Sequence, residues 1–155
     1  MSIKQINEQK DILYNNILLL SRNSVFYTKF NLNDTFQNRI HLIFIHISFL
    51  FIKIKQSDQK KLYKEFYQKI FDLIFYKIEL NMREIGYGDT VINKNMKFLV
   101  KIFYSILLNS ERYNKMSIRD KNNFFNNFLK ENSVKNITDN DKIVDYFNKY
   151  EAFCF

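Results

Sequence analysis

The stretch IHLIFIHISFLFI at residues 40–52 decides the fold class of this chain. Its 13 residues are too few to span a membrane, which takes a helix of about 20 apolar residues. Drawn as a helix, the stretch places apolar side chains on nearly every side, as in helices that are buried all round. It therefore predicts a very apolar helix at the centre of the fold.

The residues on either side of this stretch predict where the central helix begins and ends. Asp34 or Thr35 is a suitable N-cap residue, because its side-chain oxygen can accept a hydrogen bond from the first turn. The helix is expected to continue to about Lys55. Upstream, apolar residues at roughly helical spacing predict a first helix over residues 3–20. A short aromatic segment and a polar loop connect the two helices.

The clearest amphipathic pattern follows the central helix, where Ser57 or Asp58 is expected to begin a new helix. Its apolar residues recur every four positions, with a last step of three, at Leu62, Phe66, Ile70, Ile74, Ile78, Met82 and Ile85. Gly86 suits the left-handed residue that commonly ends a helix. Asp89 or Thr90 is then expected to cap the next helix.

The helical pattern continues to the end of the chain. One face of the next helix is apolar, at Ile92, Met96, Leu99, Phe103 and Ile106. A second stripe on the same helix is basic, at Lys94, Lys97 and Lys101. Residues 117–120 resemble a capping box that opens a helix to about residue 130. Residues 138–141 resemble another, which opens a last helix.

The composition agrees with this helical pattern. The chain has 155 residues, with no proline and only two glycines, and these are the residues that most turns between strands require. Hydrophobic residues make up 46% of the chain, which is enough for one core. We therefore expect an all-α fold, a single domain over residues 1–155 built as a bundle of about six to seven helices.

The net charge of +8 has two explanations. It invites an anionic partner such as RNA, the ribosome or an anionic membrane surface, and the stripe of Lys94, Lys97 and Lys101 is its most focused feature. The excess of lysine, alongside abundant Ile, Asn, Phe and Tyr, is also what an AT-rich coding sequence would give. A basic helical module that binds RNA or the ribosome is therefore one functional hypothesis.

No arrangement of side chains in the sequence predicts an enzyme, a metal site or a cofactor site. His41 and His46 are five residues apart, so on a helix they point about 140° apart and cannot share a metal ion. The glycine pair that begins at Gly86 matches no phosphate-binding motif. An enzyme hypothesis would need a pocket that brings His46 together with Arg39 and a carboxylate such as Asp34.

The ends of the chain bear on where it acts. Residues 1–16 carry Glu8 and Asp11 and lack the apolar run of a signal peptide and the acid-free, Arg-rich pattern of a transit peptide. The single cysteine, Cys154, cannot form an internal disulfide and fits a reducing compartment. These features favour a cytoplasmic location.

Two segments of the chain share an arrangement with a known family. In the first, a Phe-Tyr pair is followed by a loop, an Asp-Thr pair, an arginine and an apolar helix with a histidine: Phe26, Tyr27, Asp34, Thr35, Arg39 and His46. In the second, an Arg-Glu-aliphatic-Gly turn precedes a helix with lysine, methionine and a Phe-Tyr pair: Arg83, Gly86, Asp89, Lys94, Met96, Lys97, Phe103 and Tyr104. Over roughly residues 24–110, the chain resembles the ubiquinol–cytochrome c chaperone family.

This resemblance implies a helical assembly factor that is not an enzyme and has no cofactor. Such proteins bind newly made cytochrome b during biogenesis of the cytochrome bc complex, respiratory complex III. Mitochondrial relatives act in the matrix with a small partner subunit near the ribosome exit, and a bacterial relative would lie on the cytoplasmic face of the inner membrane. The candidate partner-binding residues are Phe26, Tyr27, Asp34, Thr35, Arg39, His46, Gly86, Asp89, Lys94, Lys97, Lys101 and Tyr104.

Overall fold

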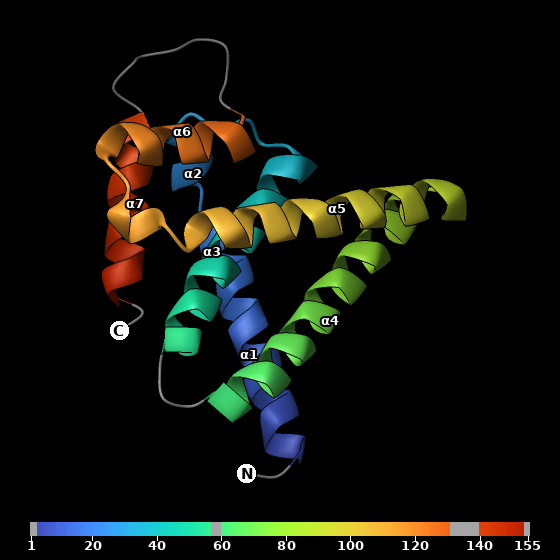
Figure 1. Ribbon diagram of the computed structural model, residues 1–155. Coiled ribbons are helices and arrows are strands. Elements are labelled where there is room, and N and C mark those ends of the chain that lie inside the picture. The colour runs from blue at the N-terminus through green and yellow to red at the C-terminus, as the bar shows by residue number, and fades with distance from the viewer. Residues whose placement is uncertain (1–2, 57–59, 131–139, 154–155) are drawn as a thin grey trace.

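Every regular element of the computed structural model is a helix within the residues that it describes, which are 3–56, 60–130 and 140–153 (Figure 1). In chain order the elements are α1 (Ile3–Ser21), α2 (Val25–Thr28), α3 (Phe36–Gln56), α4 (Lys60–Ile85), α5 (Asp89–Ser110), a short 3₁₀ helix (Tyr113–Lys115), α6 (Ile118–Phe128) and α7 (Asn140–Phe153). The all-α, single-domain class predicted from the sequence is confirmed.

The other long helices pack around α3. This helix contacts α1, α4 and α5, and α5 crosses in front of it in Figure 1. All residues from 40 to 49 are buried. Because ten consecutive residues complete nearly three helical turns, burial extends around the whole circumference of α3. The polar side chains in this range are those of His41, His46 and Ser48. Because they are shielded from water, their hydrogen-bond partners must come from inside the protein, or the side chains stay unpaired.

Aromatic side chains fill the angle between α4 and α5, which diverge from a shared turn (Figure 1). The rings of Phe71 and Phe75 lie 4.5 Å apart, and the ring of Phe103 lies 5.6 Å from that of Phe71. Phe44 joins them from α3, with its ring 5.3 Å from that of Phe103. These edge and tilted contacts are the geometries that aromatic pairs prefer, so they fix how α4 and α5 lie on α3.

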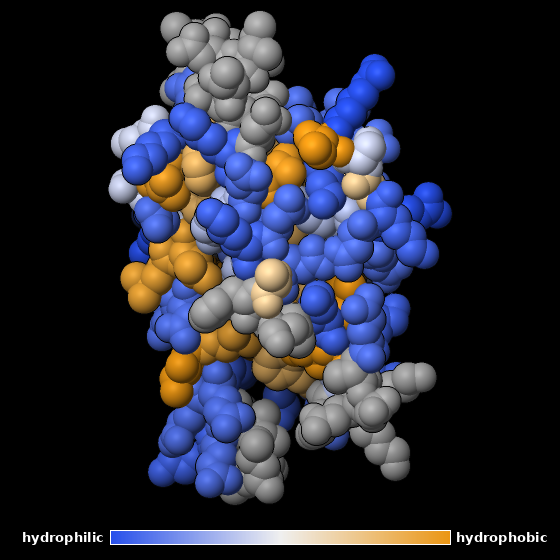
Figure 2. Space-filling view, turned by 90° about the vertical axis from the view of Figure 1, so that its left-hand side faces the viewer, coloured by the Kyte–Doolittle hydropathy of each residue, from blue (hydrophilic) through white to orange (hydrophobic). Residues whose placement is uncertain are grey.

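A second part of the fold is formed by α6 and α7, which contact each other. Ile143, Val144 and Phe147 of α7 are buried. Seen from the side on which α7 lies in Figure 1, the surface is largely hydrophilic, with hydrophobic residues in separate patches (Figure 2).

Three of the predicted helix ends have the expected local structure. The Thr35 hydroxyl accepts a hydrogen bond from the Asn38 N–H at 3.2 Å, as an N-cap does at the start of α3. The Ser117 hydroxyl accepts one from the Asp120 N–H at 3.2 Å at the start of α6. Gly86 has a φ of +103° where α4 ends. The caps predicted at residues 57–58 and 138–139 lie outside the described residues.

Two local predictions were wrong. Asp89 and Thr90 lie inside α5, and Gly88 precedes this helix with no side-chain cap. The Asp89 carboxylate instead accepts a hydrogen bond from the Arg83 guanidinium. Ile85, expected in the buried stripe of α4, is 61% exposed, because it is the last residue of α4 and borders an open groove.

Candidate functional site

Two grooves open where α3 begins and where α4 turns into α5. The first has a volume of about 280 Å³ and lies between α1, α3 and α4, with Leu18, Ile43 and Ile85 among its lining residues. The second has a volume of about 230 Å³ and lies between α3, α4 and α5. Phe36 and Ile40 of α3 line both grooves, so the two form one continuous surface, which we call the twin grooves.

The twin grooves bring together the two segments that resemble the chaperone family. Phe36 and Arg39 come from the first segment, and Met82, Ile85 and Tyr87 come from the second. Residues some 45 positions apart in the sequence therefore share one surface, because α4 folds back along α3 and its C-terminal end lies beside the start of α3.

The margins of the twin grooves are apolar and accessible to solvent. Phe36 is 39% exposed, Tyr87 46%, Phe98 56% and Ile85 61%. Large apolar side chains scattered singly on a surface are ordinary, but a contiguous apolar patch commonly marks a site of interaction. Four exposed apolar side chains around two grooves form such a patch.

Arg39 is fixed at the edge of the first groove by an ion pair. Its Nε and Nη2 atoms donate hydrogen bonds to the two carboxylate oxygens of Asp34, at 2.7 and 2.9 Å. The hydrogen bond from Arg39 lowers the pKa of the Asp34 carboxyl. The guanidinium also lies 6.0 Å from the ring centre of Tyr27. Three predicted partner-binding residues therefore form one cluster beside the groove.

Phe26 and His46 lie inside the protein and do not reach this surface. Both have an exposed fraction of 0%, and their rings lie 5.9 Å apart. Burial lowers the pKa of His46 to about 4, so this imidazole is neutral at pH 7. His46 lines neither groove, and the residues on which an enzyme hypothesis depends, His46, Arg39 and Asp34, do not share a pocket there.

Gly86 and Asp89 shape the turn that carries Tyr87. The positive φ of Gly86 ends α4. Arg83 donates a hydrogen bond across the turn to Asp89 and another to Glu79, one helical turn earlier in α4. At the other side of the grooves, the Thr35 hydroxyl caps the start of α3. The three predicted residues Thr35, Gly86 and Asp89 thus position the margins of the twin grooves.

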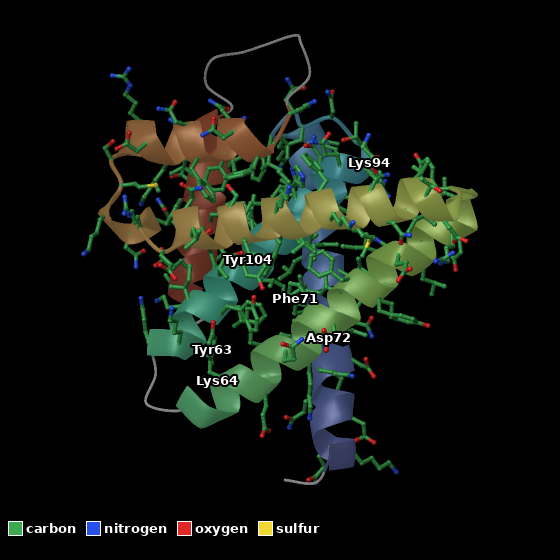
Figure 3. The ribbon with its side chains drawn as sticks, turned by 45° about the vertical axis from the view of Figure 1, so that its right-hand side comes forward. Tyr63, Lys64, Phe71, Asp72, Lys94 and Tyr104 are labelled. Carbon is green, nitrogen blue, oxygen red and sulfur yellow. The ribbon has the colours of Figure 1, made fainter. Side chains whose placement is uncertain are left out.

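The predicted basic stripe lies on the exposed side of α5. Lys94, Lys97 and Lys101 are all exposed, and Tyr104 is 44% exposed. Figure 3 shows Lys94 and Tyr104 at separate positions along α5, with Phe71 of α4 near Tyr104. The rings of Phe71 and Tyr104 lie 6.1 Å apart. Phe98, which lines the second groove, belongs to the same helix.

Sequence reasoning missed Asn38 and the twin grooves themselves. The buried Asn38 amide donates hydrogen bonds to the Asn33 and Lys130 carbonyls at 2.8 and 2.7 Å, and it accepts one from the Lys130 N–H at 3.0 Å. A polar residue at the start of an apolar helix is the signal that could have found it. Exposed Phe36, Ile85 and Phe98 carry no comparable signal, because apolar residues are expected in the core.

The described residues contain neither a cluster of metal ligands nor a helix suited to crossing a membrane. No group of three or more His, Cys, Asp or Glu side chains is placed to hold a metal ion among them. In the same ranges, no helix combines the length and apolar character that crossing a membrane demands.

An all-helical domain with an apolar double groove, rimmed by fixed charges, has the features of a protein that binds other proteins. The sequence matches the family model for the ubiquinol–cytochrome C chaperone over residues 28–150, and the chain belongs to this family. The match extends past the predicted resemblance at residues 24–110 and includes α6 and most of α7.

A solved structure has a similar fold. It is the crystal structure of the Cbp3 homolog from Brucella abortus, with a TM-score of 0.67 and 23% sequence identity, over 81% of this chain and 70% of that chain. No curated protein matches the sequence. The similar structure establishes that the helices of this chain adopt a fold seen before.

Proposed function

We propose that this protein binds newly made cytochrome b and assists its assembly into the cytochrome bc complex, respiratory complex III. The observation that carries the proposal is the apolar double groove in a member of the ubiquinol–cytochrome C chaperone family. Cytochrome b has apolar helices, and a helix that leaves the ribosome before it is embedded exposes them to water. A chaperone for such a client needs an apolar surface that is open to solvent.

The twin grooves suit the apolar face of one client helix. Helices commonly bind in apolar grooves through side chains three or four residues apart, and such neighbours are about 5–6 Å apart along the helix. Phe36 and Ile40 line both cavities, whose volumes are about 280 and 230 Å³, and we call this shared boundary the ridge. Two successive apolar side chains of the client would therefore enter on either side of this ridge.

The lining favours contact with many apolar sequences instead of one. Met82 and Leu99 line the second groove with Phe98, and flexible methionine side chains adapt to differently shaped partners. In a bacterium this binding would take place at the cytoplasmic face of the inner membrane, and in a eukaryote in the mitochondrial matrix. A small partner subunit, implied by the family resemblance, belongs to the same proposal.

Deletion of the gene tests the function. We expect the level of assembled cytochrome bc complex to fall while the other respiratory complexes stay at normal levels. The measurement is native gel electrophoresis of detergent-solubilised membranes with spectroscopic detection of haem b. A normal level of the cytochrome bc complex in the deletion strain would refute the proposal.

A matched pair of variants tests the groove. Phe36→Asp places a charge on the ridge, whereas Ile118→Asp makes the same change at the first residue of α6, where Ile118 is 69% exposed. Tagged Phe36→Asp is expected to lose cytochrome b in pull-downs from solubilised membranes and to fail to rescue the deletion. Ile118→Asp should behave as the wild type. Equal capture of cytochrome b by both variants would show that the client does not bind in the twin grooves.

A further inference from the structure

The exposed side of α5 combines basic and apolar side chains. Six residues form it, and we call them the α5 face: Lys94, Lys97, Phe98, Lys101, Tyr104 and Leu108. At 100° per residue they fall within about 120° of the helix circumference. Phe98 is 56% and Leu108 64% exposed. The opposite side of the same helix, with Ile92, Phe103 and Ile106, is buried.

The charge of the α5 face has one sign. The sequence from residue 90 to residue 110 contains three lysines and no aspartate or glutamate. The acidic residues at the two ends of this stretch are engaged elsewhere, since Asp89 accepts a hydrogen bond from Arg83 and Glu111 pairs with Lys55 at 3.5 Å. The three lysines therefore present an uncompensated positive charge to whatever covers this helix.

The mixture of side chains distinguishes between two anionic partners. A helix that lies on a membrane surface places lysines among anionic headgroups and apolar side chains at the boundary with the acyl chains. RNA recognition draws on arginine, whose planar group pairs with phosphate, and on aromatic rings that stack on bases. The α5 face has no arginine, and Leu108 cannot stack. Both observations favour a lipid surface.

We propose that the α5 face lies against an anionic membrane surface, with its lysines among the headgroups and Phe98 and Leu108 inserted beside them. This proposal rests on the proposed function, because a chaperone for cytochrome b must release its client into a membrane. Phe98 also lines the second groove. The groove that holds the client would therefore open at the level of the membrane surface.

Vesicle flotation tests this proposal with purified full-length protein. We expect binding to vesicles of phosphatidylcholine with phosphatidylglycerol and little binding to phosphatidylcholine alone. Replacing Lys94, Lys97 and Lys101 by glutamine should weaken binding to the anionic vesicles by about tenfold or more. The pair Phe98→Ser and Leu108→Ser should weaken it at unchanged net charge. Circular dichroism checks that each variant keeps its helices.

A second triple variant controls for net charge. Lys29, Lys115 and Lys149 are exposed and lie outside α5, and changing all three to glutamine should leave vesicle binding near the wild-type level. An equal loss from both triple variants would overturn the proposal in favour of general attraction. Unchanged vesicle binding by the α5 triple variant, with lost binding to a ribosomal RNA probe, would overturn it in favour of RNA.

The outcome is separable from that of the proposed function. In detergent solution the triple variant of the α5 face should still capture cytochrome b, because no bilayer is needed there. Phe36→Asp should show the reverse, with vesicle binding kept and the client lost. Loss of both properties in the α5 triple variant would mean that the lysines contact the client, which would contradict a lipid-binding role.

Discussion

The Nε2 atom of His46 lies 2.9 Å from the hydroxyl oxygen of Tyr146, although the two residues are 100 positions apart in the chain. The other ring nitrogen, Nδ1, lies 2.6 Å from the Leu42 carbonyl oxygen. Because a carbonyl can only accept, Nδ1 carries the hydrogen of the neutral ring and Nε2 accepts one from Tyr146. This bond joins α7 to the buried middle of α3.

Removing the Tyr146 hydroxyl should destabilise the protein. Tyr146→Phe leaves the His46 Nε2 atom as a buried acceptor without its partner, and we expect the free energy of unfolding to fall by about 1–3 kcal/mol. Urea unfolding followed by circular dichroism measures the change. Tyr76→Phe is the control, because Tyr76 is 59% exposed, and should change stability by less than about 0.5 kcal/mol. Equal stability of the two variants would contradict the assigned bond.

The protein should lose stability as the pH falls from 7 to 4. Burial lowers the pKa of His46 from 6.5 to about 4, so below pH 6.5 the unfolded chain takes up a proton that the folded protein does not. By linkage, the contribution of His46 to stability is full above pH 6.5 and decreases by about 3 kcal/mol by pH 4. The lowered pKa values of His41 and Asp34 act in the same direction.

Unfolding in urea at a series of pH values measures this loss. His46→Gln should be less stable at pH 7 but should lose less stability on acidification than the wild type. The difference between the two slopes isolates the histidine from the carboxylates. Parallel curves for the two proteins would mean that folding leaves the pKa of His46 unchanged, which would contradict the lowered value.

The helices and their buried faces could be predicted because they follow from local spacing. Ile70, Ile74, Ile78 and Met82 recur at helical intervals, and all four are buried in the structure. The cap at Thr35 and the left-handed Gly86 also depend on neighbouring residues only. Such features are set within a few residues of the chain, so a single sequence contains them.

The twin grooves could not be predicted because they depend on how distant helices meet. Ile85 continues the apolar stripe of α4 in the sequence, yet it is exposed, since α1 and α3 leave a groove beside it. The partner of Asp89 was missed for a related reason. An aspartate at position 89 could either cap α5 or pair with Arg83. The sequence is the same in both cases, and only the folded structure shows that Asp89 pairs with Arg83.

Asn38 should be among the most sensitive residues outside the apolar core. Its side chain makes three hydrogen bonds to the backbone of Asn33 and Lys130. Asn38→Ala removes all three, although the Asn33 and Lys130 carbonyls each keep a hydrogen bond from another backbone N–H. We expect the free energy of unfolding to fall by about 2–4 kcal/mol. Gln37→Ala changes the exposed neighbour and should cost less than about 0.5 kcal/mol. Chemical unfolding measures both variants. Equal stabilities of the two would contradict the role of Asn38.

The two glycines of the α4–α5 turn should differ in their tolerance of a side chain. Neither position has another atom within 4 Å of an added Cβ, but Gly86 has a φ of +103° and Gly88 a φ of −75°. Gly86→Ala should therefore lower the free energy of unfolding by about 1–2 kcal/mol, because an L-residue is strained there. Gly88→Ala should be neutral or should stabilise the protein by up to about 1 kcal/mol, since it restricts the unfolded chain. Thermal unfolding of the pair separates backbone strain from crowding, because crowding is absent at both positions. Equal losses in the two variants would show that the turn does not depend on the left-handed residue that ends α4.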